Sequence, residues 1–302
     1  MVTIRQLTYF VAAAQTGSAT RAAQVLNVSQ PSISAAIREL EAELGRTLFV
    51  RRQSQGLELT DAGADKLREA RAIVAQARSF SAPGAGGRSR HLTLGYFSTI
   101  GPSWVPGILH RLGRDLPDFA VDLRECDLGE IARFLERGIV DLAISYDVGI
   151  PPAMARETLA EITPYAVLAE DHPLAAQEAV TLAELARYPF ILVDLPLSRE
   201  FLMVPFWRQG LSPDIVLRTG SVEMVRSMVA NGLGVSLLFT RPSHDLTHDG
   251  KRVVSRPVRD DTLAQRVVVA CDAARAEETG LASAIAVVRG LARGQGGSPG
   301  QA

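Results

Sequence analysis

The chain has 302 residues, of which 47% are hydrophobic and 22% are charged, a balance typical of globular proteins with two or three compact units. No apolar run reaches the roughly 18 residues of a membrane span, and the start has no signal-peptide pattern, so we expect a cytoplasmic protein without a membrane partner. Residues 1–90 hold 12 Lys and Arg against 7 Asp and Glu, whereas residues 91–302 hold 20 against 26. A basic head on an acidic body favours a nucleic-acid contact within the first 90 residues.

The first predicted elements are a helix over residues 4–15 and two further helices joined by a tight turn over residues 18–45. Ser18 and Ser29 are good N-caps for the two joined helices, and Asn27 suits the left-handed conformation of the turn. Gly45 is a typical helix end. The second of the joined helices has one apolar stripe, made by Ile33, Ile37, Leu40 and Leu44.

The face opposite that stripe is short and polar. Its side chains are Gln30, Ser32, Ser34 and Arg38, with Ser29 as the cap and Pro31 in the first turn. A recognition helix needs such side chains in order to lie in a DNA major groove with its first turns towards the base edges. An ordinary antiparallel helix pair with solvated polar residues explains these two helices alone equally well.

The segment after these helices predicts a wing and a long helix. Residues 46–60 read as two short strands around a turn at Gln55-Gly56, with Arg51 and Arg52 beside it, which completes a winged helix-turn-helix over residues 1–60. A helix follows over residues 61–80, within a linker and hinge segment of residues 61–90, and its apolar side needs a partner. That side consists of Leu67, Ala70, Ile73, Val74 and Ala77. Residues 81–90 are rich in Gly, Pro and Ser, which predicts the hinge.

From residue 91 onward, predicted strands and helices alternate. Strands at 91–97, 119–126 and 139–146 enclose helices at 103–117 and 128–138, which is a βαβαβ order with a parallel sheet. After a Pro-rich break near residue 150, a second set has strands at 162–169, 189–195, 214–220, 234–239 and 253–258, with helices at 181–188, 198–210 and 221–232. A last strand at 264–272 precedes a helix near 275–293. Two α/β lobes are expected: lobe I at about 91–162 and 266–302, and lobe II at about 163–265.

These features resemble the LysR-type transcriptional regulators over nearly the whole chain. In the first segment the resemblance is carried by Leu7, Phe10, Ser18, Ala22, Ala23, Leu26, Ser29–Ser34, Ile37, Leu40, Glu41, Leu44, Gly45, Leu48, Phe49, Arg51 and Thr60–Gly63. In the second half it is carried by Asp171–Ala175 and Met228–Val235. The resemblance implies an α+β multi-domain fold: a winged helix-turn-helix, a long linker helix and, over residues 91–302, a two-lobed effector domain like a periplasmic binding protein.

The resemblance also implies a function and partners. The function is sequence-specific DNA binding that is modulated by a small-molecule effector, an organic acid or an aromatic compound, without enzymatic activity or a cofactor. The partners are double-stranded DNA with an inverted repeat, the effector, RNA polymerase and further copies of the chain. The copies are expected to form a dimer through residues 61–80 and a tetramer from two dimers. DNA contacts are expected from Ser29, Gln30, Pro31, Ser32, Ser34, Arg38, Arg51 and Arg52.

Candidate effector contacts follow from the placement of ligands in open α/β sheets, beyond the carboxyl ends of strands and beside helix N-termini. The residues at such places are Ser98, Thr99, Asp127, Ser198, Thr219 and Ser221. Hydroxyl groups and free N–H groups suit a carboxylate. Each hydroxyl can instead be a simple helix cap. For Asp127, whose charge would repel an anion, capping of helix 128–138 is the favoured interpretation.

Two other functions compete with this prediction. An α/β enzyme fused to a DNA-binding head is disfavoured because the sequence has no GxSxG elbow, in which the serine stands between a strand and a helix, and no GxxxxGK[ST] or HExxH motif. A transport-type solute-binding protein is disfavoured by the basic winged head. Cys126 and Cys271 have no metal-binding spacing, and we expect them to be buried small hydrophobic residues rather than a redox pair.

Overall fold

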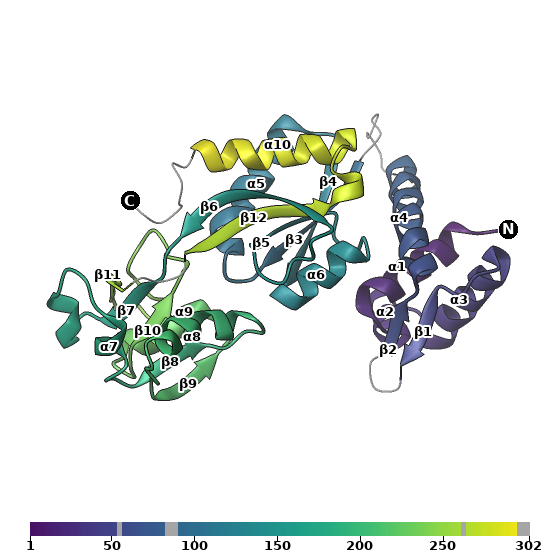
Figure 1. Cartoon of the computed structure of the whole chain (residues 1–302). Coiled ribbons are helices and arrows are strands. Elements are labelled where there is room, and N and C mark those ends of the chain that lie inside the picture. The colour runs from purple at the N-terminus through teal and green to yellow at the C-terminus, as the bar shows by residue number, and fades with distance from the viewer. Residues whose placement is uncertain (53–55, 82–89, 261–263, 295–302) are drawn as a thin grey trace.

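The computed structural model describes residues 1–52, 56–81, 90–260 and 264–294. Figure 1 shows a small N-terminal head at one end of the molecule and a larger two-lobed α/β body beside it, with helix α4 (Asp61–Ser81) rising from the head. This arrangement is the α+β multi-domain fold that the sequence predicts. Among the described residues, no helix combines the length and the apolar character that crossing a membrane requires.

The head consists of three helices and a two-stranded wing. Its elements are α1 (Ile4–Thr16), α2 (Ala19–Leu26), α3 (Gln30–Leu44), β1 (Phe49–Arg52) and β2 (Gly56–Leu59). The side chain of Ser18 accepts the Arg21 N–H at 3.4 Å, and that of Ser29 accepts the Ser32 N–H at 3.3 Å. Asn27 has a φ of 53°, so the predicted caps and the predicted turn are confirmed.

The wing is fixed to the helices through backbone groups. The N–H groups of Leu48 and Phe49 both donate to Glu41 Oε1, at 2.7 and 3.1 Å, which ties the wing to α3. At the other strand, a Cβ on Gly56 would lie 2.4 Å from the carbonyl oxygen of Gly17, and the φ of Gly56 is +82°. Glycine is therefore required at position 56. Residues 53–55, which include the predicted turn residue Gln55, lie outside the described residues.

Helix α4 packs on the head of its own chain. Leu67, Ala70 and Val74 are buried in the core that α4 shares with α1, whereas Ile73 is 43% exposed. The expectation that the whole apolar side of this helix needs a second copy is therefore wrong for Leu67, because its side chain is already covered. Ile73 keeps an apolar surface that a partner can contact. The predicted hinge falls largely on residues 82–89, outside the described residues.

Lobe I is a five-stranded sheet with the strand order β4-β3-β5-β12-β6. The strands are β3 (Arg90–Phe97), β4 (Phe119–Cys126), β5 (Leu142–Tyr146), β6 (Met154–Ile162) and β12 (Gln265–Asp272). Three of them are parallel, and β12 runs antiparallel between β5 and β6. The helices are α5 (Gly101–Asp115), α6 (Leu128–Glu136) and α10 (Thr279–Gly294), with α5 and α10 on one side of the sheet and α6 on the other (Figure 1). A 3-10 turn, η2 (Ala273–Arg275), follows β12.

Lobe II repeats this topology. Its strands are β7 (Tyr165–Ala169), β8 (Phe190–Val193), β9 (Ile215–Thr219), β10 (Ser236–Leu238) and β11 (Val253–Pro257). The pairings β9-β8 and β10-β7-β11 are joined by a bridge between Phe190 and Val235, which gives the order β9-β8-β10-β7-β11. Its helices are α7 (Leu182–Leu185), α8 (Ser198–Arg208) and α9 (Val222–Ala230), with the 3-10 turn η1 (Pro173–Ala176).

One strand escaped the sequence analysis. No element was predicted for residues 155–161, between the Pro-rich break and the strand expected at 162–169, because Arg156, Glu157 and Glu161 interrupt the apolar pattern there. β6 is an edge strand of lobe I that pairs with β12 in the described sheet, and only Leu159 and Ala160 of its nine residues are buried. Such a strand carries a weaker hydrophobic signal than the buried parallel strands beside it.

Candidate DNA-binding surface and effector cavity

The N-terminal part of α3 forms an exposed polar surface above a buried stripe. Ser29, Gln30, Pro31, Ser32 and Arg38 are exposed and Ser34 is half-buried. On the opposite side, Ile33, Ile37 and Leu40 are buried, and Leu44 is half-buried. The head thus brings six of the eight residues predicted for DNA contact onto one side of one helix. Such a helix can enter a major groove without unpacking its core.

The polar side chains on this surface are already hydrogen-bonded to one another. The Gln30 side-chain amide donates to Ser34 Oγ at 2.7 Å, and the Ser29 and Ser32 hydroxyls lie 2.7 Å apart. The Arg38 Nε donates to the carbonyl of Ser34 at 3.2 Å. These bonds restrict the rotamers of the side chains before any base is contacted. The remaining two predicted residues, Arg51 and Arg52, belong to β1, and their side chains lie outside what the structure describes.

A cavity of about 1000 Å³ lies between the two lobes of the body. Of the six residues predicted for effector contact, Ser98 and Thr99 line it from lobe I and Ser221 lines it from lobe II. Ser98 and Thr99 are not helix caps, because the cap of α5 is Ile100 and makes no side-chain hydrogen bond. Ser221 has both roles, since its Oγ accepts the Met224 N–H at 3.2 Å at the start of α9.

The other three predicted residues do not line this cavity. Asp127 forms a capping box at the start of α6: its Oδ1 accepts the Glu130 N–H at 2.7 Å, and Glu130 Oε2 accepts the Asp127 N–H at 3.1 Å. Ser198 is buried in the first turn of α8. Thr219 Oγ1 accepts the Ser221 N–H at 3.3 Å and so shapes the turn before α9. For Asp127 and Thr219, local backbone structure accounts for the polar side chain.

The sequence analysis missed the largest part of the cavity wall, which follows β10. This wall segment, residues 240–248, contributes Thr240, Arg241, Pro242, Ser243, His244, Leu246, Thr247 and His248. Ser103, Glu125 and Glu223 line the cavity as well. The rule that places ligands beyond the carboxyl ends of strands applies equally to the strand at 234–239, and its use there would have found the wall segment.

A buried arginine holds the wall segment in place. Arg226 of α9 is only 2% exposed and donates to the carbonyl oxygens of His244 and Leu246, at 2.8 and 3.2 Å. Its third partner is the carboxylate of Glu223, at 2.9 Å. A buried guanidinium is tolerated here because these three oxygen acceptors compensate for the lost hydration of its charge. Arg226 is therefore a positioning residue for the cavity wall.

Aromatic rings form a layer behind the wall segment. Tyr146 of β5 is buried, and its ring centroid lies 5.3 Å from that of Phe97 and 6.2 Å from that of Phe239. Its hydroxyl lies 3.2 Å from Thr240 Oγ1, and the Tyr165 hydroxyl donates to the Thr240 carbonyl at 2.8 Å. Burial raises the pKa of Tyr146, and the hydroxyls of Thr240 and Thr99 partly offset the rise. Thr240 thus joins both lobes beside the cavity.

The C-terminal end of α6 and its neighbours contact the head. Arg71 of α4 donates to the carbonyl oxygens of Gly138 and Ile139, at 2.9 and 2.6 Å, and burial lowers the pKa of its guanidinium. Arg137, the C-cap of α6, pairs with Glu58 of the wing. These contacts connect the lobe that carries Ser98 and Thr99 to the DNA-binding head.

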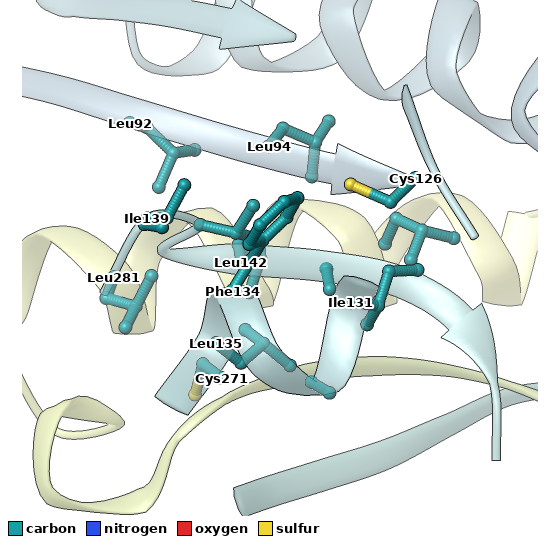
Figure 2. Packing of buried hydrophobic residues seen from close by; sticks show 14 of the residues in the cluster. Leu92, Leu94, Cys126, Ile131, Phe134, Leu135, Ile139, Leu142, Cys271 and Leu281 are labelled. Atoms are coloured by element: carbon teal, nitrogen blue, oxygen red, sulfur yellow. The ribbon is translucent and has the colours of Figure 1, made fainter. Parts of the chain in front are cut away.

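The two cysteines are buried in the core of lobe I. Figure 2 shows Cys126 near Leu94 and Cys271 near Leu135, so the two sulfur atoms point into separate parts of the cluster. Cys126 is 3% exposed and Cys271 is 2% exposed. Burial, with the nearby carboxylate of Glu130, raises the pKa of the Cys126 thiol to about 12, and burial raises that of Cys271 as well. Both thiols are therefore protonated near neutral pH, which disfavours reaction with oxidants.

Comparison with known proteins identifies both parts of the chain. The model of the bacterial regulatory helix-turn-helix proteins of the lysR family matches residues 4–64, and the model of the LysR substrate binding domain matches residues 85–293. The Hca operon transcriptional activator HcaR of Escherichia coli is 31% identical over 260 residues, which cover 84% of this chain and 86% of HcaR. The DNA-binding transcriptional dual regulator OxyR of Escherichia coli is 31% identical over 239 residues, which cover 78% of each chain.

A solved structure agrees over the full length. The crystal structure of HinK, a LysR family transcriptional regulator from Pseudomonas aeruginosa, superimposes with a TM-score of 0.63 at 32% sequence identity and covers 100% of both chains. A winged head that presents α3, a body with an interlobe cavity, and the match of two family models to consecutive parts of the chain lead to one conclusion. The chain belongs to the LysR family of effector-modulated, DNA-binding transcriptional regulators.

Proposed function

We propose that this regulator reads its DNA site with the N-terminal turns of α3 and is switched by a small organic molecule in the interlobe cavity. The observation that carries the proposal for DNA is the exposure of Gln30 and Arg38 on a helix whose other side is the head's core. Gln30 offers a donor and an acceptor to one base edge, and Arg38 offers several donors. Ser29, Pro31, Ser32 and Ser34 then lie against the groove and its phosphates. Arg51 and Arg52 contact phosphate or the minor groove from the wing.

Two substitutions in the head separate base reading from phosphate contact. Gln30→Ala is expected to weaken binding to the specific site by about 1–3 kcal/mol and to relax specificity at one base position. Arg52→Ala is expected to weaken all sequences about equally and to flatten the salt dependence by about one unit. The measurement is a gel shift with the DNA upstream of the chain's own gene and a randomised competitor, at several salt concentrations.

A matched control for Gln30→Ala is Gln209→Ala, because Gln209 is exposed in lobe II, where its side-chain amide donates to Asp260 at 2.9 Å. The control is expected to bind DNA as the unaltered protein does. Wild-type affinity together with unchanged base preference in Gln30→Ala would show that another surface reads the bases.

The effector site is proposed at Ser98 and Thr99 on one side of the cavity and Ser221 on the other. Support comes from their position on opposite lobes, because a ligand held by both lobes can favour one lobe arrangement over another. A coupling of about 1–3 kcal/mol is enough to change DNA binding. Ser98→Ala and Ser221→Ala are each expected to lower effector affinity by roughly 1 kcal/mol. Ligand-free DNA binding should survive, since the head is untouched, and an unaltered effector affinity in both variants excludes the site.

The remaining proposals concern oligomeric state, cellular location, a protein partner and enzymatic activity. The exposed side of α4 around Ile73 supports dimerisation through this helix. In keeping with the family pattern, two dimers form a tetramer that binds an inverted-repeat DNA site. We further propose that the chain acts in the cytoplasm, contacts RNA polymerase and catalyses no reaction. These proposals are supported by the regulator names of its relatives HcaR and OxyR.

A further inference from the structure

The interlobe cavity is lined mainly by hydroxyl groups, and the aromatic rings in its described lining are the imidazoles of His244 and His248. Seven of its side chains are Ser or Thr: Ser98, Thr99, Ser103, Ser221, Thr240, Ser243 and Thr247. Its apolar contacts are aliphatic and come from Leu195, Val222, Leu246, Pro102 and Pro242. Within the described residues, no Phe, Tyr or Trp lines this cavity. A ligand here therefore meets many hydrogen-bonding groups and a few aliphatic patches.

The aromatic rings that pack around Thr240 are not part of the cavity lining. Tyr146 is 4% exposed, and its hydroxyl is turned to Thr240, which does line the cavity. The Phe239 ring packs between those of Tyr146 and Phe201, with centroid distances of 6.2 and 5.5 Å. Because these rings are occupied with one another, they offer no face on which a ligand ring can stack.

The charges on the cavity wall favour an anion on the lobe II side. Arg241 is 42% exposed, and its ion pair with Asp245 is loose, at 3.7 Å, so its guanidinium remains accessible. Of the two acids, Glu223 is neutralised by Arg226 at 2.9 Å, and Glu125 accepts a hydrogen bond from Tyr96 at 3.2 Å on the lobe I side. The accessible guanidinium can bind a carboxylate through two parallel bonds.

The lobe I side contains a buried hydroxyl, that of Thr99, whose polar neighbour among the described residues is Tyr146. Thr99 Oγ1 is buried and makes no hydrogen bond of standard geometry with the described residues. It lies beside the Tyr146 hydroxyl, which is directed to Thr240. A buried hydroxyl whose one neighbour is already bonded elsewhere can turn to a polar group of a ligand in the cavity that Thr99 lines.

We propose that the interlobe cavity binds a compact aliphatic carboxylic acid, with its carboxylate on Arg241 and a second polar group, a hydroxyl, oxo or carboxylate group, at Thr99 and Ser98. The inference rests on the proposed effector site and names its ligand class. Leu195, Val222 and Leu246 pack on the short hydrocarbon part. An aromatic acid is a poorer ligand, because its ring would remove water from the seven hydroxyls without replacing the lost hydrogen bonds.

The test is calorimetry on the full-length protein with two matched sets of probes. The aliphatic set is malate, citrate, 2-oxoglutarate and gluconate, and the aromatic set is benzoate, salicylate, phenylacetate and cinnamate. At least one aliphatic acid is expected to bind, and the aromatic acids are expected to bind at least about tenfold more weakly or not at all. Arg241→Gln should lower the affinity for the bound acid about tenfold or more, because a charge-assisted bidentate contact is lost. Thr99→Val should lower it about fivefold.

Arg218→Gln is the matched control, because Arg218 is 49% exposed and pairs with Asp194 at 3.5 Å, outside the cavity. Tighter binding of an aromatic acid, binding of no aliphatic acid, or an affinity that Arg241→Gln leaves unchanged would each overturn the proposal. A gel shift of the unaltered protein without any acid tests the proposed function separately from the ligand class. Failure to bind DNA in that gel shift contradicts the proposed function, whereas the ligand class is judged by the calorimetry alone.

Discussion

Replacement of Arg226 by Met provides a direct test of how the cavity wall is held. Met fills much of the same buried volume but offers no donor, so the carbonyls of His244 and Leu246 and the carboxylate of Glu223 lose a charged partner. Hydrogen bonds to charged groups contribute about 1.5–3 kcal/mol each. Glu223 is 37% exposed and is hydrated once Arg226 is replaced, so the loss of this ion pair adds little to the destabilisation. The sum over the two carbonyls is about 3–6 kcal/mol, close to the cost of other broken buried ionic contacts.

The assay is thermal unfolding followed by circular dichroism. For a domain of this size, 1 kcal/mol corresponds to about 2–4 °C, so a fall in Tm of about 10 °C is expected for Arg226→Met. Arg226→Lys should lie in between, because it keeps the charge but not the fork of donors. Arg218→Met, which alters an exposed arginine of the same lobe, should change stability by less than about 1 kcal/mol. If Arg226→Met were as stable as this control, the reasoning about the wall segment would be refuted.

Three further predictions concern oligomerisation, thiol reactivity and pH. Ile73→Asp should give smaller species in sedimentation while the head stays folded. Leu67→Asp should instead unfold the head, because Leu67 is 0% exposed. An unchanged assembly in Ile73→Asp would show that the dimer interface lies elsewhere. Because the pKa of the Cys126 thiol is raised to about 12, the native protein should react with a thiol reagent at pH 8 far more slowly than the urea-unfolded chain, and equal rates would contradict its burial. Burial lowers the pKa of His172, whose Nδ1 accepts the Leu174 N–H at 3.2 Å. The neutral ring therefore stabilises the fold fully above pH of about 6.5, and this contribution is lost as the pH falls towards the folded-state pKa. Urea unfolding at pH 5.5 and 7.5 should show a smaller difference for His172→Asn than for the unaltered protein.

The head was predictable because its signals are local. Ser18 and Ser29 cap helices and Asn27 turns the chain through contacts with residues at most a few positions away, so their types reveal their roles. What covers the apolar side of α4 was only partly predictable. An apolar stripe shows that a helix needs cover, but whether α1 or a second copy covers Leu67 depends on tertiary packing.

The cavity was harder to predict, because its residues come together through tertiary structure. One cavity brings together Ser98, Thr99 and Ser221, whereas Asp127 and Thr219 bond nearby backbone N–H groups. Because both groups of residues follow strands, their positions in the sequence do not distinguish the two roles. The wall segment has no local motif. Its position depends on Arg226, whose burial and bonds to residues 18 and 20 positions further along cannot be read from its neighbours in the sequence.

The topology of lobe I has a consequence for how the chain folds during synthesis. β12 lies between β5 and β6, and it is the only strand that β6 pairs with in the described sheet, yet the two are separated by the whole of lobe II. At about 5–20 residues per second, the ribosome needs roughly 5–20 s to travel from Ile162 to Gln265. All strands of lobe II emerge within that interval, so lobe II can fold first while β6 presents an unpaired edge. Released chains that end just before residue 265 are thus expected to hold a protease-resistant lobe II beside an unfinished lobe I.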